Sequence, residues 1–296
     1  MTVATTAARA VALSPVGNDV LTSLYRHRLL STSQIRAIHA PEGTARGVRK
    51  TLARLVEGGY VDRVGVSGTP ETAWFVTPLG VEAVEGSGVA ARPYRMTPER
   101  ARGPLQSHTI AVNDVGIAFL EAARRRGDDF DANGWRHETA HPITEGRKPE
   151  LLIADAVIDY TVHESDGEIF LCRFVEVDRG TMSVREVAAK LTHYARLYHF
   201  RPAADTGWRQ HYPRFPKVLV VLCGKPHPVL ERRLRSLLEM ARRDPELVGL
   251  VDELGISVTT LEQLAHRGPF APIFWRLGGA VGPVDVLGRR PGETAR

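Results

Sequence analysis

The chain has 296 residues, which is enough for two domains of ordinary size. Hydrophobic residues make up 43% of the sequence, so a sizeable core is expected and a globally disordered chain is excluded. Lysine and arginine number 39 against 34 acidic residues, a net charge of +5 that permits nucleic-acid binding without establishing it.

The two cysteines, Cys172 and Cys223, each stand in an apolar run typical of a strand. Two isolated thiols form neither a disulfide framework nor a zinc cluster, so both are predicted to be buried core residues in a reducing compartment. Residues 1–17 lack the apolar segment of a signal peptide and are predicted to be a disordered tail. Because no run approaches the roughly 20 apolar residues of a membrane span, we expect a cytoplasmic protein with no membrane partner.

Residues 18–85 form the first predicted domain. Hydroxyl residues precede two of its helical segments, where a side-chain oxygen can accept a hydrogen bond from a free backbone N–H. Two glycines, Gly58 and Gly59, stop the third helix. The predicted elements are a helix over 19–30, a short helix ending near residue 40, a third helix over 45–57, and two strands joined by a turn over 60–77.

The third helix is predicted to be apolar on one side and cationic on the other. The expected core stripe consists of Ala45, Val48, Leu52, Leu55 and Val56. The expected outward set consists of Arg46, Arg49, Lys50 and Arg54. Arginine and lysine on a recognition helix contact phosphates and guanine edges in the major groove, so these four residues are the predicted DNA-binding set. The order of elements resembles the winged helix-turn-helix family, which implies double-stranded DNA as the partner. The alternative is a protein-interaction winged helix whose charges are merely solvated.

A Gly-, Pro- and Arg-rich segment, residues 86–107, has no apolar period and is predicted to be a linker. Residues 108–280 alternate between helical and strand patterns, which favours an α/β domain with a central mixed sheet, so that the fold class is α+β overall. Residues 281–296 are predicted to be a disordered tail. The expected elements of the second domain are helices over 107–126, 184–200 and 229–243 and strands over 135–138, 151–162, 169–178, 217–223 and 255–259.

Three acidic residues of this domain are candidate catalytic and metal-binding residues. Asp155 stands on the second of these strands, and Glu176 and Asp178 end the third strand on one face of the sheet. Three converging carboxylates could hold Mg²⁺ or Mn²⁺, which would activate a water molecule and stabilise charge on a phosphate. The alternative is that these acids cap loops or pair with arginines, and the candidates for that pairing are Arg173, Arg179 and Arg185.

The helix–strand–strand–strand–helix–strand order resembles the PD-(D/E)XK restriction-endonuclease-like superfamily. The resemblance assigns Asp155 as the first acid, preceded here by Ala154 instead of proline, and Glu176 as the second. It requires a lysine two residues after Glu176, where this chain has Asp178. Lys190, on the following helix, is the candidate catalytic substitute for that lysine.

Both domains together resemble the replication-relaxation family of actinobacterial mobile elements. The segment Val175 to Thr181, with Lys190 and Tyr194 on the next helix, is the most specific part of that resemblance. The family implies a role in plasmid replication or DNA relaxation.

Three functions stay open from the sequence. The first is a duplex-DNA-binding protein with a nuclease-like second domain. The second is a Mg²⁺-dependent DNA endonuclease or nickase. The third is a transcriptional repressor whose α/β domain only forms a homodimer. The position of Lys190 separates the first two, because contact with the acids favours the enzyme and exposure to solvent favours the binding protein.

Overall fold

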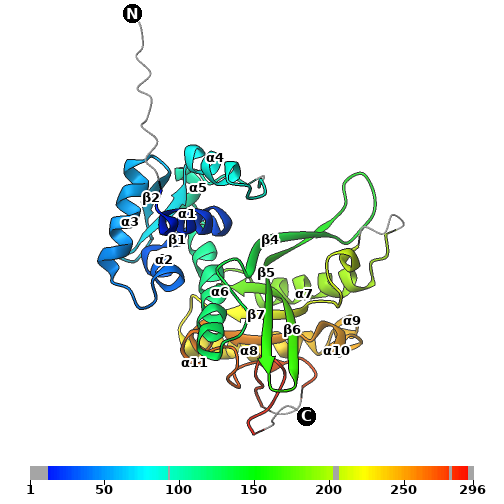
Figure 1. Ribbon diagram of the computed structural model, residues 1–296. Helices are drawn as coiled ribbons and strands as arrows, with labels where there is room; N and C mark the ends of the chain where they lie inside the picture. Colours follow the sequence, from blue (N-terminus) through cyan, green and yellow to red (C-terminus); the bar gives the residue numbers. More distant parts are fainter. Residues whose placement is uncertain (1–12, 93, 203–206, 280–281, 293–296) are drawn as a thin grey trace, which may run out of the picture. The chain divides into compact units, whose positions relative to one another are not determined.

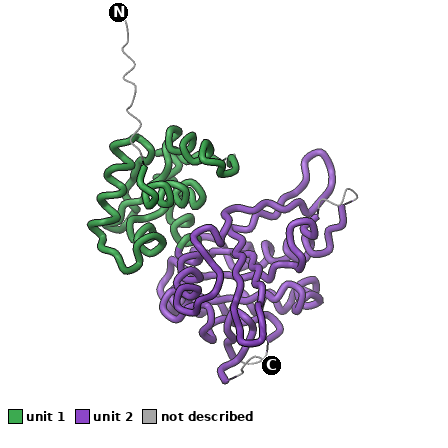
Figure 2. The backbone as a smooth tube through the Cα atoms, in the orientation of Figure 1, with its two compact units in different colours: residues 1–113 green, residues 114–296 purple. Residues whose placement is uncertain are grey.

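The structure of the chain is a computed structural model that describes residues 13–92, 94–202, 207–279 and 282–292. It divides into two compact units, residues 1–113 and 114–296 (Figure 2). Helix α6 (Gln106–Arg126) begins in the first unit and ends in the second. The predicted N-terminal tail lies largely outside the described residues, since helix α1 already begins at Pro15.

Unit 1 contains mainly helices in its first half, and each begins at a capping hydroxyl residue. The side chains of Ser14, Ser31 and Thr44 accept backbone hydrogen bonds at the starts of α1 (Pro15–His27), α2 (Thr32–His39) and α3 (Ala45–Glu57). Ser31 and Gln34 form a reciprocal capping box at α2. The predicted bounds of the third helix are confirmed, because an N-cap at Thr44 and two glycines after Glu57 define both ends.

Three antiparallel strands complete unit 1 in the order β1-β3-β2. Figure 1 labels the two outer strands, β1 and β2. Strands β2 (Val61–Gly65) and β3 (Thr72–Val76) form a hairpin. The two-residue strand β1 (Leu30–Ser31) pairs with β3 on the side opposite β2. Helix α4 (Pro78–Gly86) follows the hairpin. The sequence predicted the hairpin strands but not β1, which is too short for an alternating pattern to be recognised.

The segment predicted as a linker, residues 86–107, instead packs against unit 1. It contains the short helix α5 (Pro98–Arg102), whose Ala101 is fully buried with Leu29, Val64 and Phe75. Gln106 donates hydrogen bonds to the carbonyl oxygens of Gly65 and Ala101 at 2.9 and 2.8 Å. The linker prediction was therefore wrong: one buried alanine and one buried amide anchor the segment, and neither produces an apolar period.

Unit 2 is built on a six-stranded mixed sheet with the order β4-β5-β6-β7-β8-β9. The central pairs β6–β7 and β7–β8 are parallel, and the outer pairs are antiparallel. The expected central mixed sheet and the α+β class are thus confirmed. The strands are β4 (Trp135–Pro142), β5 (Leu151–Glu164), β6 (Gly167–Asp178), β7 (Lys217–Leu222), β8 (Ser257–Thr260) and β9 (Trp275–Arg276).

The main core of unit 2 lies between this sheet and the long helices α7 (Val184–His199) and α8 (His227–Ala241). Phe174 of β6 and Tyr194 of α7 are fully buried there, with ring centroids 5.3 Å apart. Burying this apolar surface is the main favourable contribution to the stability of the unit. The shorter helical segments are η1 (Trp208–Gln210), α9 (Pro245–Val248), α10 (Val251–Leu254) and α11 (Leu261–Arg267).

The C-terminal segment 282–292 packs against the sheet, which corrects the prediction of a disordered tail for these residues. Residues 281 and 293–296 of the predicted tail, 281–296, lie outside the described residues. Val284 and Val286 are buried, and Val284 forms a β-bridge with Phe274. The two cysteines are free and buried, as predicted. No helix within the described ranges is both long enough and apolar enough to cross a membrane.

Candidate functional site

The sheet of unit 2 forks between β5 and β6. The paired register of these strands ends at Ala156 and Val175. The residues of β5 that precede Ala156 lie beside β4, and the residues of β6 that follow Val175 lie beside β7. At the fork, Oδ2 of Asp155 accepts a hydrogen bond from the backbone N–H of Val177 at 2.8 Å. The Asp155 carboxylate therefore satisfies a backbone donor where the strand partner has turned away.

Glu176, the next acid along β6, meets two side chains from α7. Lys190 Nζ donates a hydrogen bond to Oε2 of Glu176, and the Tyr194 hydroxyl donates one to Oε1. Lys190 Nζ also lies 3.5 Å from Oδ1 of Asp155. Lys190 and Tyr194 are four residues apart on α7, so they lie on one helix face and reach the same carboxylate. The structure thus places Lys190 against both predicted acids.

Burial and the neighbouring charges determine the ionisation of this cluster. Burial raises the pKa of Glu176 to about 8, and the charge of Asp155 acts in the same direction against the opposing effects of Lys190 and Tyr194. Burial alone would lower the pKa of Lys190, but the charges of Glu176 and Asp155 outweigh it and raise that pKa. Lys190 therefore stays protonated, and Glu176 is the member that titrates near neutral pH.

Asp178 does not join this cluster. Its Oδ2 accepts a hydrogen bond from Nε of Arg233 on α8, and its Oδ1 accepts one from the backbone N–H of Gly180 at 2.8 Å. Arg233 also donates to the carbonyl oxygen of Met182 at 2.6 Å. Both side chains are largely buried, with 6% of Asp178 and 12% of Arg233 exposed. The pairing of Asp178 with an arginine was one of the two sequence interpretations, although none of the three arginines named for it is the partner.

The acids present do not match the three-carboxylate metal site that the sequence suggested. Lys190 contacts both Glu176 and Asp155, and Arg233 pairs with Asp178. Among the residues that the structure describes, no group of three or more His, Cys, Asp or Glu side chains is placed to hold a metal ion. Binding of Mg²⁺ or Mn²⁺ stays a prediction from the sequence.

The three side chains of the cluster differ in their exposure to solvent. The exposed fractions of the side chains are 30% for Lys190, 17% for Asp155 and 7% for Glu176. A polar ligand that approaches the fork would therefore meet the Lys190 ammonium and the Asp155 carboxylate first. Glu176 lies behind them and can take up or release a proton near neutral pH, which suits a general acid or base.

A second candidate site is the outward face of α3 in unit 1. Arg46, Arg49, Lys50 and Arg54 are all exposed, and no ion pair within the described residues involves any of them. Val48, Leu52 and Leu55 are buried on the opposite side of the helix. The predicted core stripe was too wide, because Ala45 and Val56 at the two ends of the helix are exposed. The predicted cationic set is present as one unpaired, solvent-facing group of charges.

The comparison with known families decides the classification. The family model for replication-relaxation proteins matches residues 21–208, which is more than half of the chain. The chain belongs to the replication-relaxation family. No curated protein and no solved structure gives a significant match.

The region matched by the replication-relaxation family includes the α3 face, Asp155, Glu176 and α7 with Lys190. Arg233 lies on α8, beyond the matched region, as does the C-terminal segment that packs on the sheet. The resemblance stated from the sequence is thus confirmed at the level of the family.

The site contains one residue that sequence reasoning missed and one whose role it did not recognise. Arg233 lies within one helical turn of both Leu230 and Leu237, which are buried in the core stripe of α8. A charged residue inside such a stripe is a signal of a buried opposite charge, since an unpaired buried guanidinium is costly. Tyr194 was noted beside Lys190, but its fully buried hydroxyl bonded to Glu176 could not be foreseen without the register of α7 on β6.

Proposed function

We propose that this chain is a duplex-DNA-binding protein of a plasmid or other mobile element, acting in the replication or relaxation of its DNA. Membership of the replication-relaxation family supports the context. The observation that carries the proposal is the face of α3, where four cations are exposed without carboxylate partners in the described structure. Such a face attracts the phosphates of DNA and releases their counterions.

Unit 1 is proposed to be a winged helix, with α3 as the recognition helix and the β2–β3 hairpin as the wing. The order α1-β1-α2-α3-β2-β3 supports this assignment. The wing turn closes with a hydrogen bond from the Val66 N–H to the Glu71 carbonyl oxygen at 2.9 Å, and Gly68 supplies the positive φ of 76° that the turn needs. Arg63 adds a cation on the hairpin, 5.6 Å from the centroid of the Trp74 ring.

The direct test is an equilibrium titration of labelled duplex DNA with the full chain and with the double variant Arg46→Ala/Lys50→Ala. The proposal expects the double variant to bind at least tenfold more weakly, because each exposed cation that contacts a phosphate contributes to affinity. A matched control is Arg232→Ala/Arg235→Ala, which removes two exposed cations from α8 of unit 2. Equal losses in both double variants would show only a nonspecific effect of net charge.

A second candidate function is a DNA endonuclease with a restriction-endonuclease-like unit 2. One observation favours it: Lys190 contacts Asp155 and Glu176 at the fork of the sheet, where the superfamily resemblance expects a lysine beside two acids. The test is nicking of supercoiled plasmid by the purified chain with Mg²⁺ or Mn²⁺. Nicking by wild type that Asp155→Asn abolishes would support the enzyme, and equal nicking by both would assign the activity to a contaminant.

A further inference from the structure

A small cationic cavity lies in unit 2 at the beginnings of β7 and β8. Its volume is about 70 Å³, and its lining includes Arg173, Lys217 and Arg276 together with the loop over 284–288. Arg173 is paired with Lys217 in the parallel register of β6 and β7, and Arg276 is paired with Ser257 across β8 and β9. The strand register itself therefore brings the three cations to one place.

None of the three cations has a carboxylate partner within the described residues. Arg173 donates one hydrogen bond to the carbonyl oxygen of Cys172 at 3.0 Å and one to that of Val286 at 2.8 Å. Lys217 Nζ donates to the backbone carbonyl oxygen of Asp252 at 2.8 Å. A guanidinium carries five N–H donors and an ammonium three, so both Arg173 and Lys217 keep free donors.

The three positive charges repel one another. Burial lowers the pKa of Arg173 to about 10, and the charge of Arg276 acts in the same direction. The pKa of Lys217 is lowered by burial and then by Arg276 and Arg173, against a partial opposing effect of the exposed acids Asp252 and Glu253. Holding like charges together costs free energy, and an anion bound between them would remove that cost.

Two glycines make room for the cationic side chains. A Cβ atom on Gly288 would lie 3.2 Å from Nη1 of Arg276, and one on Gly255 would lie 2.3 Å from Cδ of Lys217. Both glycines also have positive φ, 87° and 49°, which other residues rarely adopt. The backbone on two sides of the cavity is thus shaped around the two cations.

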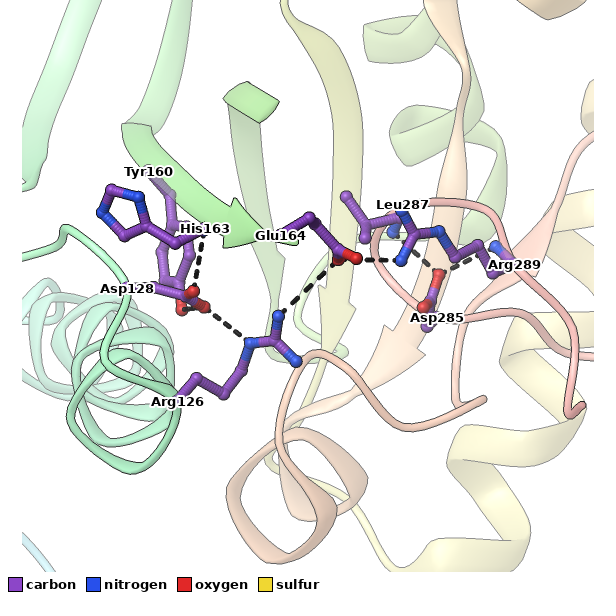
Figure 3. A network of polar contacts seen from close by, with 8 residues as sticks. All are labelled: Arg126, Asp128, Tyr160, His163, Glu164, Asp285, Leu287 and Arg289. Carbon is purple, nitrogen blue, oxygen red and sulfur yellow. Dashed lines mark hydrogen bonds and ion pairs between the residues drawn. The ribbon is translucent and has the colours of Figure 1, made fainter. Parts of the chain in front are cut away.

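Asp285, a carboxylate that lines the cavity, is engaged within its own loop. Its Oδ1 accepts hydrogen bonds from the backbone N–H groups of Leu287 and Arg289 at 2.9 and 2.8 Å. Arg289 in turn pairs with Glu164 at 2.9 Å, and Glu164 lies 3.8 Å from Arg126 (Figure 3). This network fixes the loop that forms one wall, so the cavity is pre-organised, and within the described residues Asp285 forms no ion pair with any of the three cations.

We propose that this cavity is a binding site for a phosphate group, held by Arg173, Lys217 and Arg276. Arginine forks suit the bidentate recognition of phosphate oxygens, and Lys217 adds a point charge. The cavity volume of about 70 Å³ exceeds the roughly 30 Å³ of one water molecule, so there is room for a compact anion, while a nucleoside attached to it would lie outside. The site belongs to unit 2 and does not depend on DNA binding by α3.

The test is thermal unfolding of the full chain in phosphate and in chloride of equal ionic strength. A dissociation constant of about 1 mM would raise the Tm by about 3–6 °C at about 10 mM phosphate. Arg276→Gln, at a partly exposed position, should abolish this rise in Tm. Lys217→Met, the second variant, should abolish it as well. Arg235→Gln, an exposed arginine of α8, should keep it. An equal rise in Arg276→Gln would overturn the proposal.

A second arm identifies the source of the phosphate. Calorimetric titration compares a dinucleotide that carries a 5′-phosphate with the same dinucleotide that ends in a 5′-hydroxyl. Tighter binding of the phosphorylated form, lost in Arg276→Gln, would assign the site to a terminal phosphate of nucleic acid. If inorganic phosphate raises the Tm and the two dinucleotides do not differ, the site takes a free phosphate. If neither probe binds, the proposal is wrong.

Discussion

Lys190 Nζ of α7 lies 3.5 Å from Oδ1 of Asp155 on β5, and the same ammonium group donates to Glu176. Two neighbouring carboxyl groups in a mostly buried place disfavour joint ionisation: Glu176 stays protonated below about pH 8, and the charge of Asp155 still requires a positive partner. In this chain a lysine supplies that charge from within the fold. The cluster can therefore be stable without any bound cation.

A metal titration tests this assignment of the charge. Millimolar Mn²⁺ should leave the Tm of the wild-type chain unchanged at pH 7, because Lys190 already balances the charge of Asp155 and Glu176 is protonated below about pH 8. Lys190→Met should lower the free energy of unfolding by about 3 kcal/mol, since it leaves the Asp155 carboxylate without its cation and Glu176 without one of its hydrogen-bond donors. Lys148→Met is the control, because Lys148 is exposed and forms no ion pair within the described residues. A rise of the wild-type Tm in Mn²⁺ that Glu176→Gln removes would contradict the account and restore the metal site.

The raised pKa of Glu176 makes stability depend on pH. The folded chain keeps Glu176 protonated up to about pH 8, whereas the unfolded chain loses that proton near the ordinary glutamate value of 4.5. Between these values the folded state binds more protons, so the contribution of Glu176 to stability falls as pH rises and is constant above about pH 8. The urea denaturation midpoint of Glu176→Gln, measured from pH 5 to 8.5, should therefore increase relative to that of wild type as the pH rises. Glu239→Gln, on the exposed side of α8, is the control and should show the pH dependence of wild type. If the pH profile of Glu176→Gln runs parallel to that of wild type, the pKa of Glu176 is not raised.

Replacing only one member of the buried ion pair between Asp178 and Arg233 should destabilise the fold. Arg233→Leu should lower the free energy of unfolding by about 3 kcal/mol, because Asp178 then keeps a buried charge without its partner. Asp178→Asn/Arg233→Leu should recover part of that loss, since both charges are then absent. Arg235→Leu, an exposed arginine two residues away, should change little. Urea denaturation measures all three, and no recovery in the double variant would mean that Arg233 acts through packing alone.

The packing of α5 gives a test of the corrected linker. Ala101→Asp should destabilise unit 1 strongly, because it places a charge among Leu29, Val64 and Phe75. Arg102→Asp, at the next and exposed position, should be close to neutral. Limited proteolysis provides the readout: wild type should resist cleavage over residues 96–106, and Ala101→Asp should become sensitive there. Rapid cleavage of wild type within that stretch would support the original linker prediction.

The sequence predicted elements well where local signals were strong. Helix α3 has a capping threonine and two terminating glycines, and both of its ends were placed correctly. The central strand β7 is a continuous apolar run, as expected of a strand buried on both faces. Elements held by tertiary contacts were not predicted, and the two-residue β1 and the five-residue α5 are examples.

The candidate site was predicted only in part, for a geometric reason. Asp155, Glu176 and Lys190 were named from strand and helix patterns, and they do meet. Asp178 shares the strand face of Glu176, yet a different helix determines its partner. Which helix covers which end of a strand depends on the packing of α7 and α8 on the sheet. Alternation along one strand contains no information on that packing.

The central claim, duplex-DNA binding by α3, is tested most directly by the salt dependence of affinity. Fluorescence anisotropy of a labelled duplex should give a plot of log affinity against log salt concentration for wild type, Arg46→Ala/Lys50→Ala and the α8 control Arg232→Ala/Arg235→Ala. Each phosphate contact contributes about 0.9 to the slope, so loss of two contacts should reduce its magnitude by about 1.8 and weaken binding. The α8 control should keep the wild-type slope. Unchanged affinity and slope in Arg46→Ala/Lys50→Ala would contradict the claim.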